Sequence, residues 1–393
     1  MKQEKEKTDG RMLVLLLTFG VFGIINTEMG VVGIILLIAE TFGVTVPKAG
    51  WTVSIFAGIV ALSAPVMPLF FSRFDRKKVM LAALGLFTAA NLVSAAVDHF
   101  AVVLAARALP AFLHPVYVSM AFTAAAAAVP KDMAPKASAK VFVGVSAGMV
   151  LGVPVTSFIA SHTSFSAAML FFAAVNGLGF LGTLLFMPSM LPEKKTLGAQ
   201  LAVLRRPVLL WSAAAFTFIN GAMFGFFSFM TDFLHRVSGM SFDGASAVLL
   251  GYGAANIAGN LLAGRFYSER SGRWKAVLPA ALGAGYLLLF AAGSAAFTAG
   301  AVILLLGVLA GFASVAGQSM ITSSAPEAPD FANGLFLTAA NFGTMAGTAF
   351  CGLFITLAGT RFSLAGALLF LLAAALALLF RARSAPPALS EPM

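Results

Sequence analysis

The chain has 393 residues, of which 60% are hydrophobic and only 10% are charged, and its mean hydropathy is +0.95. A soluble protein of this size carries about 25% charged residues, so the composition excludes a soluble enzyme or a soluble binding domain. The formal net charge of +10 does not indicate a nucleic-acid partner, because the basic residues lie in small clusters between apolar runs.

Apolar stretches long enough to cross a bilayer recur along the whole chain. A hydrocarbon core of about 30 Å requires about 20 apolar residues in a helix. By this criterion we predict an all-α membrane protein with twelve transmembrane helices, the first of which is an uncleaved span rather than a signal peptide. The predicted spans are 12–38, 49–71, 79–97, 101–128, 139–160, 165–187, 208–231, 244–266, 276–296, 299–322, 334–358 and 362–380.

The basic residues predict how these helices are oriented. The loops on one side, together with both termini, hold 21 of the 25 Lys and Arg residues, whereas the other side holds only Lys48, Arg236 and Arg361. Cytoplasmic loops of membrane proteins carry the excess of positive charge. We therefore expect a multi-pass protein of a bacterial-type inner membrane with both termini in the cytoplasm.

The twelve predicted helices divide into two related halves. A polar connection separates six spans from six, so we expect an N-terminal bundle at 1–187, a cytoplasmic linker at 188–207 and a C-terminal bundle at 208–393. Short sequences recur between the halves at an offset of about 194 to 200 residues; FINGAMFG at 218–225, for example, echoes IINTEMG at 24–30. Internal repeats of this kind are typical of secondary transporters.

Three stretches of the sequence carry motifs that point to a known family. They are PLFFSRFDRKK at 68–78, VVLAARALPAFLHPVYVSMA at 102–121 and GVSAGMVLGVPVTS at 144–157. With these motifs the chain resembles the major facilitator superfamily, in particular its drug:proton antiporter branch and the sugar-efflux and arabinose-efflux-like permeases. The resemblance covers nearly the whole chain and implies two pseudo-symmetric six-helix bundles. The chain departs from the family pattern at Ser72 and Asp75, where the family has an acid and a glycine.

The resemblance also indicates residues that govern conformational change. Charges at the cytoplasmic helix ends can make contacts in one state only, or can simply orient the chain; they are Arg73, Asp75 and Arg76. A second group lies in the fifth span, where small residues on one helix face allow tight packing or gating; it comprises Gly144, Gly148, Gly152 and Pro154.

Ionisable residues inside the predicted spans are candidates for proton coupling. A charge at the bilayer centre costs at least about 2.5 to 3.5 kcal/mol, so Glu28 and Arg107 are expected to face the bundle interior, and both fall at a similar depth. Burial raises a carboxyl pKa, so Glu28 could take up and release a proton as a cavity closes and opens, or it could only tie helices together through Arg107. His114 can titrate near neutral pH, and Pro115 after it predicts a kink in the fourth span.

Polar and aromatic side chains within the spans are candidates for binding a solute. An aromatic wall with a few hydrogen-bonding groups suits an amphipathic small molecule, although each such residue could serve packing alone. The candidates are Asn26, Tyr117, Asn220, Phe224, Asn256, Gln318 and Asn341.

These features together predict a proton-coupled secondary exporter of small organic solutes, such as drugs or sugars, that works by alternating access. We expect its partners to be the solute, protons and the lipid bilayer, and we expect it to act as a monomer without nucleic acid, metal or cofactor. An enzyme is not expected, because the spans hold no paired acids. The alternative is a facilitator or uptake permease of the same fold for a sugar, nucleoside or amino-acid derivative, without proton coupling at Glu28.

Overall fold

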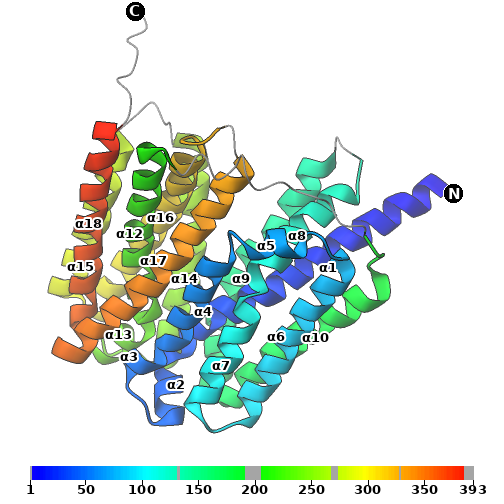
Figure 1. The fold of residues 1–393 in the computed structure, drawn as a ribbon. Helices are drawn as coiled ribbons and strands as arrows, with labels where there is room; N and C mark the ends of the chain where they lie inside the picture. Colours follow the sequence, from blue (N-terminus) through cyan, green and yellow to red (C-terminus); the bar gives the residue numbers. More distant parts are fainter. Residues whose placement is uncertain (1, 131–132, 191–204, 267–272, 327–328, 385–393) are drawn as a thin grey trace, which may run out of the picture.

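The computed structural model describes residues 2–130, 133–190, 205–266, 273–326 and 329–384 (Figure 1). Within these ranges the secondary structure is helical and contains no strand.

Helices of the first half follow one another with short connections. They are α1 (Lys2–Gly30), the 3₁₀ helix η1 (Val31–Ile34), α2 (Ile35–Phe42), α3 (Val46–Ala49), α4 (Trp51–Ser63), α5 (Met67–Phe71), α6 (Arg76–Ala96), α7 (Phe100–Ala111), α8 (His114–Ala127), α9 (Ala134–His162) and α10 (Phe165–Phe186).

The second half repeats this arrangement. Its helices are α12 (Pro207–Ser228), α13 (Met230–Arg236), α14 (Phe242–Phe266), α15 (Arg273–Ala292), α16 (Ala296–Thr322), α17 (Pro329–Ala358), the 3₁₀ helix η4 (Thr360–Phe362) and α18 (Ser363–Ser384).

Each of the twelve predicted spans coincides with a helix or with consecutive helices. Eleven helical segments in the described ranges are long and apolar enough to cross a membrane, and the remaining one, within α15, is apolar over the shorter stretch Val277–Ala292. The prediction of an all-α membrane protein with this set of spans is confirmed.

Several spans are interrupted near their middle or outer part. The first span passes from α1 into η1 after Gly30, and the fourth span breaks between α7 and α8 at Phe112 and Leu113. Pro115 lies in the first turn of α8, where a proline fits because the amide there needs no intrahelical partner. The predicted kink in the fourth span is thus confirmed, and it places His114 at the start of a new helix.

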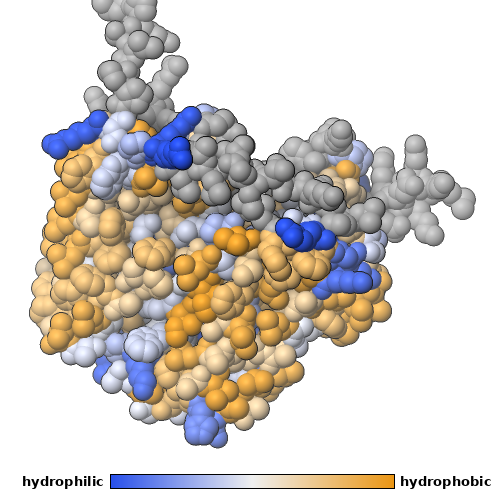
Figure 2. All heavy atoms as spheres, in the orientation of Figure 1, coloured by the Kyte–Doolittle hydropathy of each residue, from blue (hydrophilic) through white to orange (hydrophobic). Residues whose placement is uncertain are grey.

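The first helix begins and the last helix ends on the same side of the molecule. Figure 1 shows α1 beginning and α18 ending at the upper side, which we call the terminal face; the opposite side is the far face. Figure 2 shows a broad apolar belt between hydrophilic residues that gather towards these two faces. Exposed side chains such as Leu62, Leu185, Phe297 and Leu357 are more than two thirds exposed, as lipid-facing residues are.

The two halves meet chiefly through two pairs of helices, α4 with α17 and α9 with α14. In the first pair, a methyl group added at Gly58 would lie 2.5 Å from the sulfur of Met345. In the second, a methyl group at Gly253 would lie 3.3 Å from the Cα atom of Val150. Gly253 follows Gly58, and Met345 follows Val150, by the same offset as the sequence repeat. The internal repeat therefore appears as two equivalent contacts between the halves.

The exact division of the chain into domains stays a prediction. Most of the predicted linker at 188–207 lies outside the described residues, which resume at Arg205.

Candidate functional site

The carboxyl group of Glu28 on α1 lies against the imidazole of His114 at the start of α8, and the two form an ion pair when the ring is protonated. The Oε2 atom of Glu28 lies 2.9 Å from Nε2 of His114, and the two residues are 9% and 7% exposed. The ring of His114 also packs edge-on against Phe56 of α4, with centroids 5.7 Å apart. The carboxylate is thus held inside the first half and does not reach the lipid headgroups.

Arg107 on α7 lies close to Glu28, but its guanidinium group donates to backbone carbonyls. Nη1 donates to the carbonyl of Thr27 at 3.0 Å, Nη2 to that of Glu28 at 3.4 Å, and Nε to that of Thr52 on α4 at 3.0 Å. The last carbonyls of an α-helix lack intrahelical partners, and Thr27 and Glu28 stand where α1 gives way to η1. Arg107 also lies over the ring of Phe56, at 4.8 Å from its centroid. It ties three helices together beside the acid.

A small pocket of about 50 Å³ lies between the two halves. The first half contributes residues of α1 and α9, and the second contributes residues of α12, α14 and α16. The lining residues are Met29, Met149, Val150, Val153, Met223, Phe224, Phe227, Leu249, Tyr252, Gly253, Asn256, Ala310 and Ser314. The wall is mostly apolar and rich in methionine, with neutral polar groups on α14 and α16.

Two of the predicted substrate-binding residues, Phe224 and Asn256, line this pocket. Asn256 accepts a hydrogen bond from the amide of Asn260 at 3.4 Å. The side chain of Gln318 lies at the surface of α16, and the amide of Asn341 donates to its own helix, to the carbonyl of Leu337 at 3.0 Å.

The other predicted polar residues are buried between helices. Asn220 on α12 donates to the carbonyl of Ala340 at 2.6 Å and to the hydroxyl of Thr344 at 3.0 Å, so it joins α12 to α17. Asn26 and Tyr117 are 0% exposed and lie within the first half. Their roles in binding a solute stay predictions, and their positions favour packing or another function inside the bundle.

The glycines of α9 bring that helix against α1. A methyl group added at Gly148 would lie 2.8 Å from the Cβ atom of Ile25, and one added at Gly152 would lie 3.1 Å from the Oδ1 atom of Asn26. Pro154 is buried within the same helix. Tight packing, one of the two predicted uses of this motif, is seen in the structure, while its role in gating stays a prediction.

Gly144→Ala should destabilise the protein, because the new methyl group would press on the backbone carbonyl of Thr18, which cannot move aside as a flexible side chain could. Overpacking of this kind costs about 1–3 kcal/mol. We expect a lower melting temperature in detergent. Gly334→Ala on α17 is the matched control, because nothing lies within 4 Å of the added methyl group there. Equal melting of Gly144→Ala and wild type would contradict close packing at this position.

The charged motif between the second and third spans lies on the terminal face. Asp75 caps α6 by accepting from the amide of Lys78 at 3.0 Å, and its other oxygen accepts from the hydroxyl of Ser189. The Ser189 hydroxyl and the backbone amides lower the pKa of Asp75 below its usual value. Arg73 is exposed, with its guanidinium carbon 6.0 Å from the ring centroid of Phe70, whereas Arg76 is buried. The motif thus links the start of α6 to the segment after α10.

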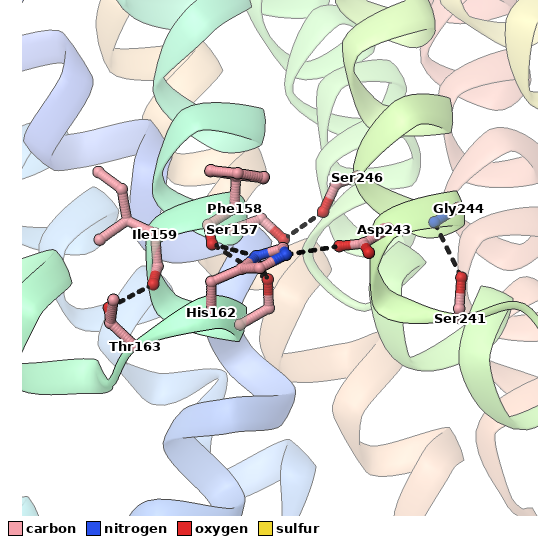
Figure 3. Close-up of polar contacts among 10 residues, drawn as sticks. Ser157, Phe158, Ile159, His162, Thr163, Ser241, Asp243, Gly244 and Ser246 are labelled. Carbon is pink, nitrogen blue, oxygen red and sulfur yellow. Dashed lines mark hydrogen bonds and ion pairs between the residues drawn. The ribbon is translucent and has the colours of Figure 1, made fainter.

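At the far face, α9 of the first half contacts α14 of the second through polar side chains (Figure 3). The hydroxyls of Ser157 and Ser246 are 2.7 Å apart and buried. One turn further out, Nε2 of His162 lies 3.8 Å from Oδ1 of Asp243. These contacts close the far end of this helix pair.

Another far-face contact involves α13. The buried carboxylate of Asp232 lies 2.7 Å from Nε of Arg236 and accepts from the hydroxyl of Thr360 at 2.6 Å. The hydroxyl of Thr231 donates to the carbonyl of Gly33 in the first half at 3.4 Å. The halves are therefore joined at the far face by two separate sets of contacts.

Sequence reasoning missed most of the pocket lining. Met29, Met149 and Met223 all lie inside motifs that the sequence singled out, but methionine in an apolar span is not distinguishable from core without knowing which helix face turns inward. The signal in the sequence was that a methionine recurs in three of these stretches. One lies next to Glu28, one in the fifth-span motif and one in FINGAMFG, which echoes the sequence around Glu28.

Known proteins resemble this chain in sequence and in fold. Residues 15–329 match the family model of the Major Facilitator Superfamily. The chain is 32% identical over 254 residues to YtbD of Bacillus subtilis, named an uncharacterized MFS-type transporter, and the alignment covers 64% of each protein, less than two thirds of YtbD. It is 26% identical over 343 residues to a Helicobacter pylori protein named "Probable sugar efflux transporter", covering 86% of this chain and 87% of that protein. The solved structure of the nucleoside transporter NupG superposes with a TM-score of 0.77 at 14% identity, covering 96% of this chain and 100% of that one.

Proposed function

The chain belongs to the Major Facilitator Superfamily, and on that premise we propose that it is a proton-coupled exporter of small organic solutes, such as drugs or sugars. The family match and the likeness to a protein named as a sugar efflux transporter confirm the resemblance inferred from the sequence motifs. Because its relatives are named as transporters, we assign the activity to transport and not to enzymatic catalysis.

The observation that carries the proposal is the position of Glu28. Its carboxylate is paired with a titratable imidazole inside the first half, while the next residue, Met29, lines the pocket between the halves. A carboxyl group closed into an apolar interior favours the protonated form, and one that meets water or a cation favours the ionised form. A change of protonation at Glu28 therefore acts on a helix that also forms the wall of the solute pocket.

The charges on the two faces indicate how the molecule is oriented in the membrane. Exposed basic residues at the terminal face include Arg73, Lys78, Arg205, Arg206 and Arg383, whereas Glu40, Asp98 and Asp243 are exposed at the far face. By the positive-inside rule, we assign the terminal face to the cytoplasm of a bacterial-type inner membrane.

The contacts between the halves support an alternating-access cycle. In the conformation described, the far face is held closed by the pair Ser157 and Ser246 and by the bond from Thr231 to Gly33. We assign this arrangement to an outward-closed state that takes up solute from the cytoplasm. Breaking these few polar contacts would let the halves rock and expose the pocket, and Glu28, to the outside.

Coupling then follows from one carboxyl group that serves both steps. A proton taken up by Glu28 from outside neutralises the carboxylate and weakens its pairing with His114, which favours return to the outward-closed state without solute. Release of that proton to the cytoplasm restores the carboxylate beside His114 and prepares the pocket for the next solute. Each cycle moves solute outward and a proton inward.

The test uses the full chain in lipid vesicles that enclose a pH-sensitive dye, with a solute selected from a panel by its shift of the melting temperature at two pH values. An acidic lumen should drive the solute into the vesicles while the lumen becomes less acidic, and a protonophore should abolish both changes. If solute moves only down its own gradient at every pH difference, the chain is a facilitator.

A further inference from the structure

A column of buried polar groups runs through the first half, apart from the solute pocket. Tyr117, Asn176 and Thr183 are 0% exposed, and His114 is 7% exposed. Within the described part of the chain, no hydrogen-bond partner is found for Oδ1 of Asn176 or Nδ1 of His114, and the hydroxyls of Tyr117 and Thr183 have only each other. Buried polar atoms without partners are rare and costly, and ordered water is the usual partner where the site is polar.

These groups follow one another from Glu28 towards the terminal face. His114 faces Glu28 through Nε2 at 2.9 Å. Tyr117 lies three residues further along α8, on the same side of the helix as His114. Its hydroxyl lies against Gly20 of α1 and beside the hydroxyl of Thr183 on α10. Thr183 in turn lies one turn before α10 ends at Phe186, on the terminal face (Figure 1).

A second set of polar groups flanks this column at the level of Glu28. The amide of Asn176 donates to the hydroxyl of Thr27 at 2.8 Å and to the carbonyl of Phe172 at 2.9 Å. This leaves its carbonyl oxygen turned towards Gly23. Gly20 and Gly23 lack side chains where the column passes α1, so polar atoms of α8 and α10 reach the surface of that helix. From Thr27 to Gly20 the column covers about 10 Å along the helix axis at 1.5 Å per residue.

We propose that these groups bind a file of water molecules that conducts the proton from Glu28 to the terminal face through the first half, separately from the solute. The inference rests on the proposed function, since it takes Glu28 as the proton carrier. Protonated Glu28 gives its proton to Nε2 of a neutral His114, and the ring gives its Nδ1 proton to the adjoining water, so the imidazole is neutral again. A turn of the ring about its Cβ–Cγ bond then returns the N–H to the side of the water. The hydroxyls of Tyr117 and Thr183 each accept one hydrogen bond and donate another, and they position water without ionising.

The charges around the column favour this direction. The ionisable groups that face Glu28 are His114 on α8 and Arg107 on α7. Arg107 precedes His114 by seven residues in the fourth span and therefore lies on the far-face side. A fixed positive charge on that side repels a mobile proton towards the terminal face.

The experiment follows protonation of Glu28 directly and needs no solute. Full-length protein in detergent receives a proton pulse from a photolysed caged proton, and time-resolved infrared absorption records the carboxyl band that Glu28→Gln removes. We expect Tyr117→Phe and Thr183→Val to slow the rise of this band at least tenfold with an unchanged final amplitude. Tyr286→Phe is the control, because this tyrosine of the second half is equally buried and donates to the carbonyl of Ala222.

Both test variants keep the shape of the side chain, and each removes one hydroxyl whose partner among the described residues is the other hydroxyl of the pair. They should therefore fold, and a purely structural hydroxyl would leave the rate unchanged. Wild-type rates in both variants would overturn the water file while leaving Glu28 as the proton carrier. Absence of any protonation band from Glu28 in the wild type would overturn the proposed function as well.

Discussion

Replacing Glu28 by glutamine should abolish accumulation of solute against its gradient and leave solute exchange in place. Glutamine keeps the size of the side chain and its place beside His114, but it cannot take up or release a proton. One pH unit corresponds to about 1.4 kcal/mol per proton, so wild type coupled to one proton should reach about a tenfold accumulation per unit of pH difference. The variant should reach a ratio near one at every pH difference, as measured with labelled solute in vesicles.

Glu40→Gln provides the matched control for this result. Glu40 is an exposed acid at the far-face end of the same span, so its loss changes the net charge in the same way without touching the buried pair. Its accumulation ratio should follow that of the wild type. A Glu28→Gln protein that still concentrates solute when the lumen is acidic would exclude this carboxylate as the coupling group.

Replacing Arg107 by alanine should cause the largest loss of stability among the site variants. The change removes the donor to the buried carbonyls of Thr27 and Thr52, and each buried acceptor without a partner costs about 1–3 kcal/mol. We expect a loss of several kcal/mol, seen as poor recovery of folded protein and a strongly lowered melting temperature in detergent. Arg107→Lys should recover only part of it, since one ammonium group cannot reproduce the planar fork that reaches two helices.

Arg73→Ala is the comparison for this variant, because Arg73 is exposed on the terminal face and single exposed charges contribute little to stability. It should melt close to the wild type. If Arg107→Ala melted normally but lost proton-driven transport, Arg107 would act on the proton itself and not as a tie between helices.

The membrane architecture was predictable because the bilayer restricts what an apolar chain can do. A span needs a fixed length of apolar sequence, so run lengths alone located the helices, and Pro115 located the kink in the fourth span. The passage from α1 into η1 after Gly30 was not predictable, because it depends on the carbonyls that Arg107 binds. That interaction joins residues 80 positions apart in the chain.

The sequence predicted how deep the site residues lie in the membrane but not which way their side chains point. Counting residues from the helix ends placed Glu28 and Arg107 at one level, and the structure has them together. Counting residues did not show that the carboxylate of Glu28 turns to His114 while the guanidinium group of Arg107 turns to backbone carbonyls. Successive helical residues point about 100° apart, so a side chain's neighbours depend on helix rotation. For the same reason, the sequence did not show that Asn220 is bonded to α17.

The paired contacts of Gly58 with Met345 and of Gly253 with Val150 have a mechanical consequence. All four residues lie near the middle of their helices. The two equivalent contacts between the halves therefore lie midway between the terminal face and the far face. If one half rotates against the other about the line through these two contacts, the interface opens at one face while it closes at the other. A larger side chain at either glycine would push the two halves apart at that point, and we expect it to hinder their rotation.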